Sequence, residues 1–225
     1  MRNYDYHPDL FEWVAMSSAF TGRRVIGTSD CLWGLLDGMN EDGLVVSLTF
    51  GGRKGSAPGF AIPLVVRYLL EVAATVEEAT AALVGLPVSM SYNLTITDRS
   101  GAVATVFVAP GMEPEVSSTA VATNHRGTTP EDPEHARRFR SVERQDHLLG
   151  LLGIGPDFDH LVGAFLREPL HTRDYAGGFG TLYTTVYRPE QGTVEYRWPD
   201  AAFMRTFESP DASVEVLLNQ APTLC

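Results

Sequence analysis

The first half of the chain consists of short apolar runs separated by turn residues. The longest run, LVVSLTF at residues 44–50, follows shorter runs at residues 23–26 and 32–36, with Asp37-Gly38 and Asp42-Gly43 between them. Runs of β-branched and aromatic residues bounded by such dipeptides are typical of strands. The pattern therefore predicts an antiparallel meander.

A loop and two helices are expected next. Residues 51–59 (GGRKGSAPG) are too rich in glycine for a helix or a strand and predict a loop. Residues 62–74 carry apolar side chains at helical spacing, as expected for a helix that packs on a sheet. Thr75, followed three positions later by Glu78, forms a capping box that begins a second helix over residues 76–83.

The second half of the chain combines the same two patterns. Asp132 as an N-cap, with Pro133 after it, begins a third helix that we expect to run to Gly153, and an apolar stripe predicts a fourth helix over residues 158–166. Strands are predicted at residues 91–97, 102–108, 116–123, 181–187, 193–198 and 203–207. Strands, then helices, then strands predict one α+β domain over residues 1–225, with two layers of sheet flanked by helices.

Composition narrows the classes of partner. Lys and Arg number 17 against 28 Asp and Glu, which gives a net charge of −11. This sign opposes binding to nucleic acids and anionic membranes. The start of the chain is too polar for a signal peptide, no apolar run reaches the roughly 20 residues of a membrane span, and Cys31 and Cys225 cannot form a disulfide framework. We therefore expect a cytoplasmic protein with no nucleic-acid or membrane partner.

Three segments carry more polar chemistry than packing requires. Residues 2–5 (RNYD) place Arg2 and Asp5 near one another on an aromatic-flanked strand. Residues 37–44 (DGMNEDGL) form a polar turn before the longest apolar run, and residues 122–125 (ATNH) end a strand with an amide. No phosphate loop, zinc motif or nucleophile elbow accompanies them.

In this order the three segments resemble the choloylglycine hydrolase and penicillin acyltransferase branch of the N-terminal nucleophile hydrolases, which includes acyl-CoA:6-aminopenicillanic acid acyltransferases and peptidase C45 relatives. Residues 180–184 (GTLYT) and 196–199 (YRWP) are similar to the C-terminal hairpin of the acyltransferase-like members. The resemblance implies a four-layer αββα sandwich of two antiparallel sheets, without the family's first strand. It also implies hydrolysis or acyl transfer at the linear amide of a small-molecule substrate, with no cofactor, and leaves a homo-oligomer open.

The resemblance further implies roles for individual residues. A cysteine at the processed N-terminus attacks the amide carbonyl, and its own α-amino group, with a pKa near ~8, acts as the base. Asp5 would hydrogen-bond that amino group, and Arg2 would favour the thiolate. The main chain of Thr49 and the side-chain amide of Asn124 would bind the oxyanion. A further family arginine belongs in the third helix, where Arg138 and Arg144 are favoured over Arg137 and Arg140.

The position of the nucleophile departs from the family pattern. In the family it precedes the strand that contains residues 2–5, whereas here Met1 stands directly before Arg2. Two expectations stay open: the cysteine lies upstream of Met1, or the chain is an inert relative or truncated product that only binds an acyl-like ligand. Cys31 has no cation near it in sequence and is expected to be a buried, unreactive core residue. His125 is expected to be a hydrogen-bonded structural histidine.

Overall fold

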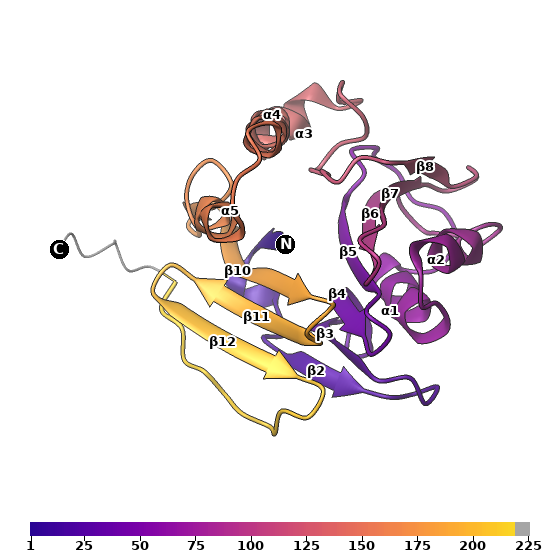
Figure 1. The fold of residues 1–225 in the computed structure, drawn as a ribbon. Helices are drawn as coiled ribbons and strands as arrows, with labels where there is room; N and C mark the ends of the chain where they lie inside the picture. Colours follow the sequence, from indigo (N-terminus) through magenta and orange to yellow (C-terminus); the bar gives the residue numbers. More distant parts are fainter. Residues whose placement is uncertain (219–225) are drawn as a thin grey trace.

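The computed structural model describes residues 1–218, whose strands form two antiparallel sheets (Figure 1). The smaller sheet has five strands in the order β1-β10-β11-β12, and β9 pairs with β10. Among the described residues, β1 therefore lies at an edge of this sheet. The strands of the smaller sheet are β1 (Arg2–Tyr6), β9 (Arg173–Asp174), β10 (Phe179–Arg188), β11 (Thr193–Trp198) and β12 (Ala201–Thr206).

The larger sheet has seven strands in chain order, β2 to β8. Each strand pairs with the next one along the chain, so the predicted meander is confirmed. Its strands are β2 (Ala15–Ser18), β3 (Val25–Asp30), β4 (Gly34–Asn40), β5 (Val45–Phe50), β6 (Tyr92–Thr97), β7 (Val103–Val108) and β8 (Glu115–Ser117).

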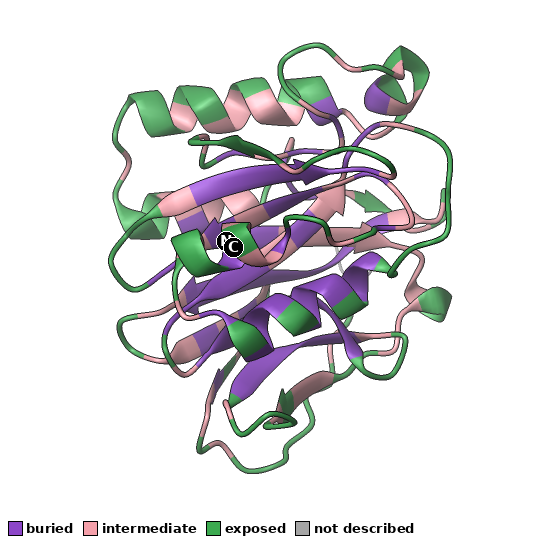
Figure 2. Cartoon of the chain, turned by 90° about the vertical axis from the view of Figure 1, so that its right-hand side faces the viewer, coloured by how far each residue is buried: buried purple, intermediate pink, exposed green. Residues whose placement is uncertain are grey.

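Helices cover the outer sides of the two sheets, which gives the expected α+β sandwich of four αββα layers (Figure 1). Helices α1 and α2 lie on the larger sheet, and Figure 2, which faces this side, shows exposed helix surfaces in front of buried strands. Helices α3 to α5 lie on the side of the smaller sheet. The helices are η1 (Pro8–Leu10), α1 (Ile62–Val72), α2 (Val76–Ala82), α3 (Pro133–Arg138), α4 (Ser141–Gly153) and α5 (Phe158–Phe165).

Two apolar clusters hold these layers together. The first packs α1 and α2 against β3 to β7, with Leu69, Leu70 and Leu94 fully buried. The second lies between the sheets, where Ile26 and Met39 of the larger sheet meet aliphatic and aromatic side chains of the smaller one. Full burial of a large aliphatic side chain contributes roughly 1.5–3 kcal/mol. Packing between the layers therefore contributes substantially to stability.

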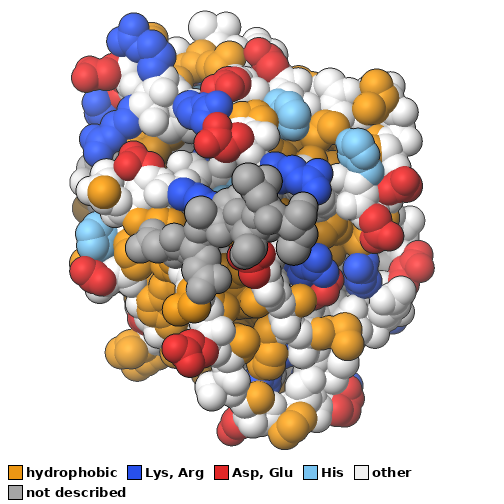
Figure 3. Space-filling view, turned by 90° about the vertical axis from the view of Figure 1, so that its left-hand side faces the viewer, with side chains coloured by type: hydrophobic (Ala, Val, Ile, Leu, Met, Phe, Trp, Pro, Cys, Tyr) orange, Lys and Arg blue, Asp and Glu red, His pale blue; other side chains and the backbone are white. Residues whose placement is uncertain are grey.

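The face of the molecule shown in Figure 3 is mixed in charge, with Lys and Arg side chains interspersed with Asp and Glu. None of the described helices has the length and apolar character required to cross a membrane.

The third predicted helix is wrong as a continuous element. It is divided into α3 and α4, because Arg140 adopts a left-handed backbone conformation with φ of 52°. Ser141, the first residue of α4, is buried and bonded to His125 from the preceding loop. The apolar pattern continues across the break, so the sequence carries no signal for it.

The predicted polar turn at residues 37–44 begins too early. Asp37 and Gly38 lie inside β4, and the chain turns after Asn40. Glycine is required at position 38 because an added Cβ would lie 2.9 Å from the main-chain oxygen of Ile26. In the sequence this glycine indicates a turn, but in the structure it allows β4 to pack closely against the neighbouring strand β3.

The predicted strand over residues 116–123 is also too long. Strand β8 ends at Ser117, and the carbonyl of Thr119 accepts a hydrogen bond from the Thr105 hydroxyl at 2.9 Å. A side chain thus replaces the strand ladder at this point. The chain then leaves the sheet as a loop that carries Asn124.

Candidate active site

A cleft of about 710 Å³ opens between the helices α3 to α5 and the two sheets. Its lining includes Arg2, Asp5, Thr49, Asn124 and Arg144. The start of the chain lies in the same region (Figure 1). The fold thus brings together side chains from two sheets, a loop and helix α4, and Arg2 and Arg144 are 142 positions apart in the sequence.

Arg138 lies outside this lining. Its side chain is exposed, and its guanidinium carbon lies 5.4 Å and 5.8 Å from the ring centres of Phe139 and Phe179. Of the two arginines favoured from the sequence, Arg144 is the one that the structure brings to the cleft.

Arg2 is buried, with 6% of its surface exposed, and pairs with the fully buried Asp37 across the space between the sheets. Asp37 also accepts hydrogen bonds from the hydroxyls of Tyr183 at 2.8 Å and Thr28 at 3.0 Å. Burial, and then the charge of Asp37, raises the pKa of Tyr183 well above its usual value of 10, so this hydroxyl keeps its proton and donates. Arg2 is thereby held in one orientation.

The Nε of Arg2 is buried, yet it has no hydrogen-bond partner among the described residues. A buried donor without a partner is costly, so this group is suited to an acceptor that the described residues do not supply.

Asp37 is a site residue that the sequence interpretation missed. It lies in the segment singled out above, but as a turn residue. The available signal was its position in an otherwise apolar run, LLDGM at residues 35–39, all of which are buried. A buried carboxylate within a strand requires a charged or hydrogen-bonding partner elsewhere in the fold.

Asp5 points to the helix side of β1. Its carboxylate accepts a hydrogen bond from Arg144 Nη1 at 2.5 Å and another from Thr181 Oγ1 at 2.6 Å. A register shift between β1 and β10 pairs Tyr4 with Tyr183 but Asp5 with Thr181. This irregularity places the Thr181 hydroxyl beside Asp5.

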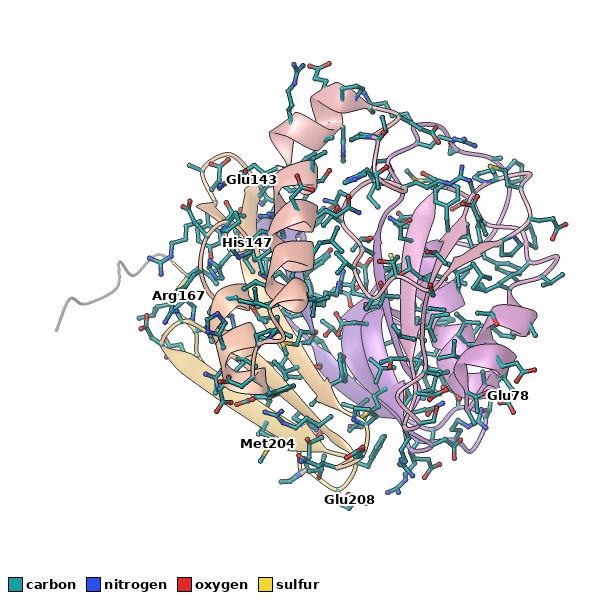
Figure 4. The ribbon with its side chains drawn as sticks, turned by 45° about the horizontal axis from the view of Figure 1, so that its top comes forward. Glu78, Glu143, His147, Arg167, Met204 and Glu208 are labelled. Carbon is teal, nitrogen blue, oxygen red and sulfur yellow. The ribbon has the colours of Figure 1, made fainter. Side chains whose placement is uncertain are left out.

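Helix α4 presents two different sides. Arg144, Leu148 and Leu152 follow the spacing of one helix face and line the cleft. Glu143 and His147 lie on another side of the helix (Figure 4). The Nε of Arg144 donates to the carbonyl of Pro169 at 2.9 Å, which fixes the guanidinium next to Asp5.

Arg2 and Asp5 do not pair with each other, contrary to the expected proximity of the two side chains. Successive side chains of a strand point to opposite faces. Arg2 meets Asp37 between the sheets, whereas Asn3 and Asp5 face the helices, where Asn3 Nδ2 donates to the Phe165 carbonyl at 2.8 Å. Both ionised groups reach the cleft from the two faces of one strand.

The loop with Asn124 lies against the end of β5. Thr49 Oγ1 donates to the carbonyl of Thr123 at 3.3 Å. The pairing of β4 with β5 ends at Ser47, so in the described part of the chain β5 continues beside β6 alone. Residues 47–50 then line the cleft.

His125 is a hydrogen-bonded structural histidine, as expected. Its Nδ1 lies 2.8 Å from Ser141 Oγ, and its Nε2 lies 3.1 Å from Gln145 Oε1. Gln145 donates its amide to the carbonyl of Gly127, so its Oε1 accepts from a protonated Nε2. Burial lowers the pKa of His125, which favours this neutral form.

The prediction that Cys31 is buried is wrong. Cys31 is exposed in the turn after β3, with φ of 55°, and lines the cleft. Glu12 stabilises this turn by accepting a hydrogen bond from the Leu32 amide at 2.8 Å. Partial burial, followed by the charge of Asp30, raises the pKa of the Cys31 thiol, which makes it a poor nucleophile at neutral pH. Cys225 lies outside the described residues.

The wall of the cleft on the helix side is apolar. Aromatic rings continue this surface: the ring centres of His135 and Phe139 are 4.4 Å apart, and those of Phe139 and Phe179 are 4.5 Å apart. Such a wall suits an apolar organic group that lies next to the polar side chains of Arg2 and Asp5 on β1. The aliphatic and aromatic residues of the helix-side wall are Leu148, Leu152, Leu161, Phe165 and Leu170.

The described residues contain no group of three or more His, Cys, Asp or Glu side chains placed to hold a metal ion. The polar side chains that line the cleft include arginines, carboxylates and amides. Groups of these kinds are able to orient a polar substrate and to donate hydrogen bonds to an oxyanion.

Comparison with known proteins gives one family match. A family model described as acyl-coenzyme A:6-aminopenicillanic acid acyl-transferase matches residues 1–202. No curated protein sequence matches the chain significantly.

Similar solved structures include two forms of conjugated bile acid hydrolase from Clostridium perfringens. The mutant form is 14% identical with a TM-score of 0.58, covering 91% of this chain and 82% of the other. The variant form is also 14% identical, with a TM-score of 0.60, and the match covers 93% of this chain and 84% of the other. Penicillin V acylase from Agrobacterium tumefaciens is 18% identical, with a TM-score of 0.53, and the match covers 90% of this chain and 73% of the other.

Proposed function

The chain belongs to the acyl-coenzyme A:6-aminopenicillanic acid acyl-transferase family and has the fold of the N-terminal nucleophile hydrolases, and on this premise we propose that it hydrolyses linear amides or transfers their acyl group. The observation that carries the proposal is the cleft itself. Arg2, Asp5, Asn124 and the β5 segment around Thr49 line one cavity whose helix-side wall is apolar. Polar groups for a reacting carbonyl and an apolar wall for an acyl group thus lie side by side.

We place the nucleophile in a cysteine at the mature N-terminus, in residues that precede Met1. The support is the environment of β1. Among the described residues this strand lies at an edge of its sheet, and its Arg2 lines the cleft and has a buried Nε without a hydrogen-bond partner. A thiolate or a carbonyl of a preceding segment would accept that hydrogen bond, and the positive charge of Arg2 would stabilise the thiolate.

The proposed reaction proceeds through a thioester. The thiol proton passes to the cysteine's own α-amino group as the sulfur attacks the amide carbonyl carbon. The Asn124 amide and a main-chain donor at Thr49 hold the oxyanion, which for one donor is worth roughly 3–4 kcal/mol. The C–N bond then breaks, and the proton leaves with the amine.

The rest of the proposed cycle involves Asp5, which positions the α-amino group, and a second attack, which breaks the thioester. The Asp5 carboxylate holds the α-amino group in place and is itself held by Arg144 and Thr181. Water attacks the thioester carbonyl in hydrolysis, and an acceptor amine attacks it in acyl transfer. Either attack releases the acyl group and returns the thiol. No step requires a cofactor.

The substrate class follows from the cleft. An apolar acyl group fits the wall that includes Leu148, Leu161 and Phe165. We propose a small-molecule acyl amide as the substrate. Conjugated bile acids and penicillin V, named for the structural relatives, are the first probes to test.

An inert relative that binds an acyl-like ligand is the second candidate. The observation that favours it is Cys31, the only cysteine among residues 1–218, whose thiol pKa is raised. If no cysteine precedes Met1, the cleft contains no activated thiol, and the chain would bind the acyl group without cleaving the amide.

The two candidates are separated by expressing the chain with the residues encoded before Met1, here called the longer chain, beside residues 1–225. Both are incubated with conjugated bile acid, penicillin V and simple N-acyl amides of increasing acyl length. We expect the longer chain to release amine and acid, and Asn124→Ala to lose about 10²–10³ in turnover. No release from any substrate by the longer chain would overturn the hydrolase proposal, as would turnover by residues 1–225 that Cys31→Ser abolishes.

A further inference from the structure

Asn93 lies behind the loop that carries Asn124. It is a residue of β6, paired with Thr49 of β5, and only 3% of its surface is exposed. Its Nδ2 donates to the carbonyls of Thr123 at 3.1 Å and His125 at 3.0 Å. One amide group therefore binds the two carbonyls on either side of Asn124.

The same loop is fixed from two further directions. On the sheet side, Gly52 has φ of 82° and packs so closely that an added Cβ would lie 2.9 Å from the Cα of His125. On the helix side, His125 is bonded to Ser141 at the start of α4. The loop thus has little freedom to move toward the sheet or the helix.

The loop is less restrained against motion along the cleft. Asn124 itself is only partly buried, and among the described residues its loop forms no strand ladder beyond a single bridge between Thr123 and His125. The bonds from Asn93 connect both carbonyls to β6. Loss of both donors would release the carbonyl of His125, while that of Thr123 would keep the Thr49 hydroxyl at 3.3 Å and the His125 amide at 2.7 Å.

We propose that Asn93 is a positioning residue for the amide cleavage described above, and that it acts by holding Asn124 in the orientation that meets the oxyanion. The inference rests on the proposed function for its kinetic consequence. It also has a structural consequence, the order of the Asn124 side chain, that is independent of catalysis.

The test compares Asn93→Asp with a matched control. Asp has the size of Asn but, when ionised, presents an acceptor to both carbonyls. Asn40 offers the same chemistry elsewhere: it is fully buried, and its Nδ2 donates to the carbonyls of Leu70 at 3.0 Å and Ala73 at 2.7 Å. Asn40→Asp therefore loses an equivalent pair of bonds outside the cleft.

The first measurement is ¹⁵N relaxation of the Asn124 side-chain NH₂ in residues 1–225. We expect the same order parameter in the parent and in Asn40→Asp, and a clearly lower one in Asn93→Asp. An unchanged value in Asn93→Asp, or an equal fall in Asn40→Asp, would overturn the inference. Asn93→Ser, which keeps one hydroxyl donor, replaces the Asp variant if that variant does not fold and should give an intermediate value.

The second measurement is the kinetics of the longer chain. Asn93→Asp should lower kcat by about 10- to 100-fold, because a small displacement of a positioned group has effects of this size, and leave KM within about threefold. Protonated Asp donates one hydrogen bond, so the ratio of variant to parent kcat should recover as the pH falls. A constant ratio, or a change in KM alone, would contradict the positioning role. An inactive parent would refute the proposed function, and the relaxation measurement would still decide the role of Asn93.

Discussion

Arg2 of β1 and Asp37 of β4 form a buried ion pair that joins the two sheets at the cleft. The pair has a structural and a chemical consequence. It connects the edge strand of the smaller sheet to the middle of the larger one, and it holds in place an arginine that lines the cleft. The same arginine thus contributes to the fold and to the proposed chemistry.

Asp37→Asn should destabilise the protein strongly. Removal of one partner leaves the buried charge of Arg2 without a counter-ion, which costs roughly 3–5 kcal/mol. Urea denaturation measures the loss. The control is Asp42→Asn, which breaks the more exposed pair of Arg23 and Asp42 and should cost less than about 1 kcal/mol. Equal losses in the two variants would show that the Arg2 pair has no special role.

Replacement of Arg144 should lower the turnover of the longer chain far more than replacement of Arg138. Arg144→Met removes the donor that holds Asp5, and misplacement of a catalytic group by about 1 Å costs about 10²-fold in turnover. Arg138→Met changes an exposed side chain and should alter turnover by less than about twofold. Rates of amide hydrolysis measure both effects. A larger loss in the Arg138 variant would reverse the assignment.

Thr181 and Thr185 provide a second matched pair, on β10. Thr181→Val removes the hydroxyl that donates to Asp5, and a hydrogen bond to a charged group contributes about 1.5–3 kcal/mol. The Thr185 hydroxyl is buried without a partner among the described residues, so Thr185→Val should be neutral or stabilising. Unfolding free energies of the two variants test the difference. Loss of stability in Thr185→Val alone would contradict the contacts at Asp5.

Much of the fold could be predicted from local pattern. The run LVVSLTF at residues 44–50 has the composition of a strand, and a short turn at residues 98–102 joins β6 to β7. Strand pairing therefore follows chain order in the larger sheet. The break at Arg140 and the exposed turn at Cys31 could not be predicted in this way. Both depend on contacts with distant residues, Ser141 with His125 and Leu32 with Glu12.

The candidate site was predicted only in part. Arg2, Asp5, Thr49 and Asn124 were named from a resemblance, and the structure places them in one cleft. Their partners were missed, because Asp37 is 35 positions from Arg2 and Thr181 is 176 positions from Asp5. Spacing along the sequence carries no information about pairs that form only when two sheets pack.

The pH dependence of stability should include a contribution from His125. Burial lowers its pKa below the usual 6.5, so the unfolded chain binds a proton more readily than the folded one as the pH falls below that value. The stabilising contribution of neutral His125 is therefore complete above pH 6.5 and decreases below it. Urea unfolding at several pH values should show the difference between parent and His125→Gln shrinking on acidification. A constant or growing difference would contradict a lowered pKa of His125.

The central claim, that an N-terminal cysteine and the cleft around Arg2 form one amide-cleaving site, is tested most directly by locating the acyl group. The longer chain is quenched during turnover of an N-acyl amide and analysed by intact-mass and peptide mass spectrometry. We predict one acyl group per chain, on the sulfur of the cysteine that precedes Met1, and none after that cysteine is replaced by alanine. An acyl group on Cys31, or substrate consumption without any acylated cysteine, would contradict the account.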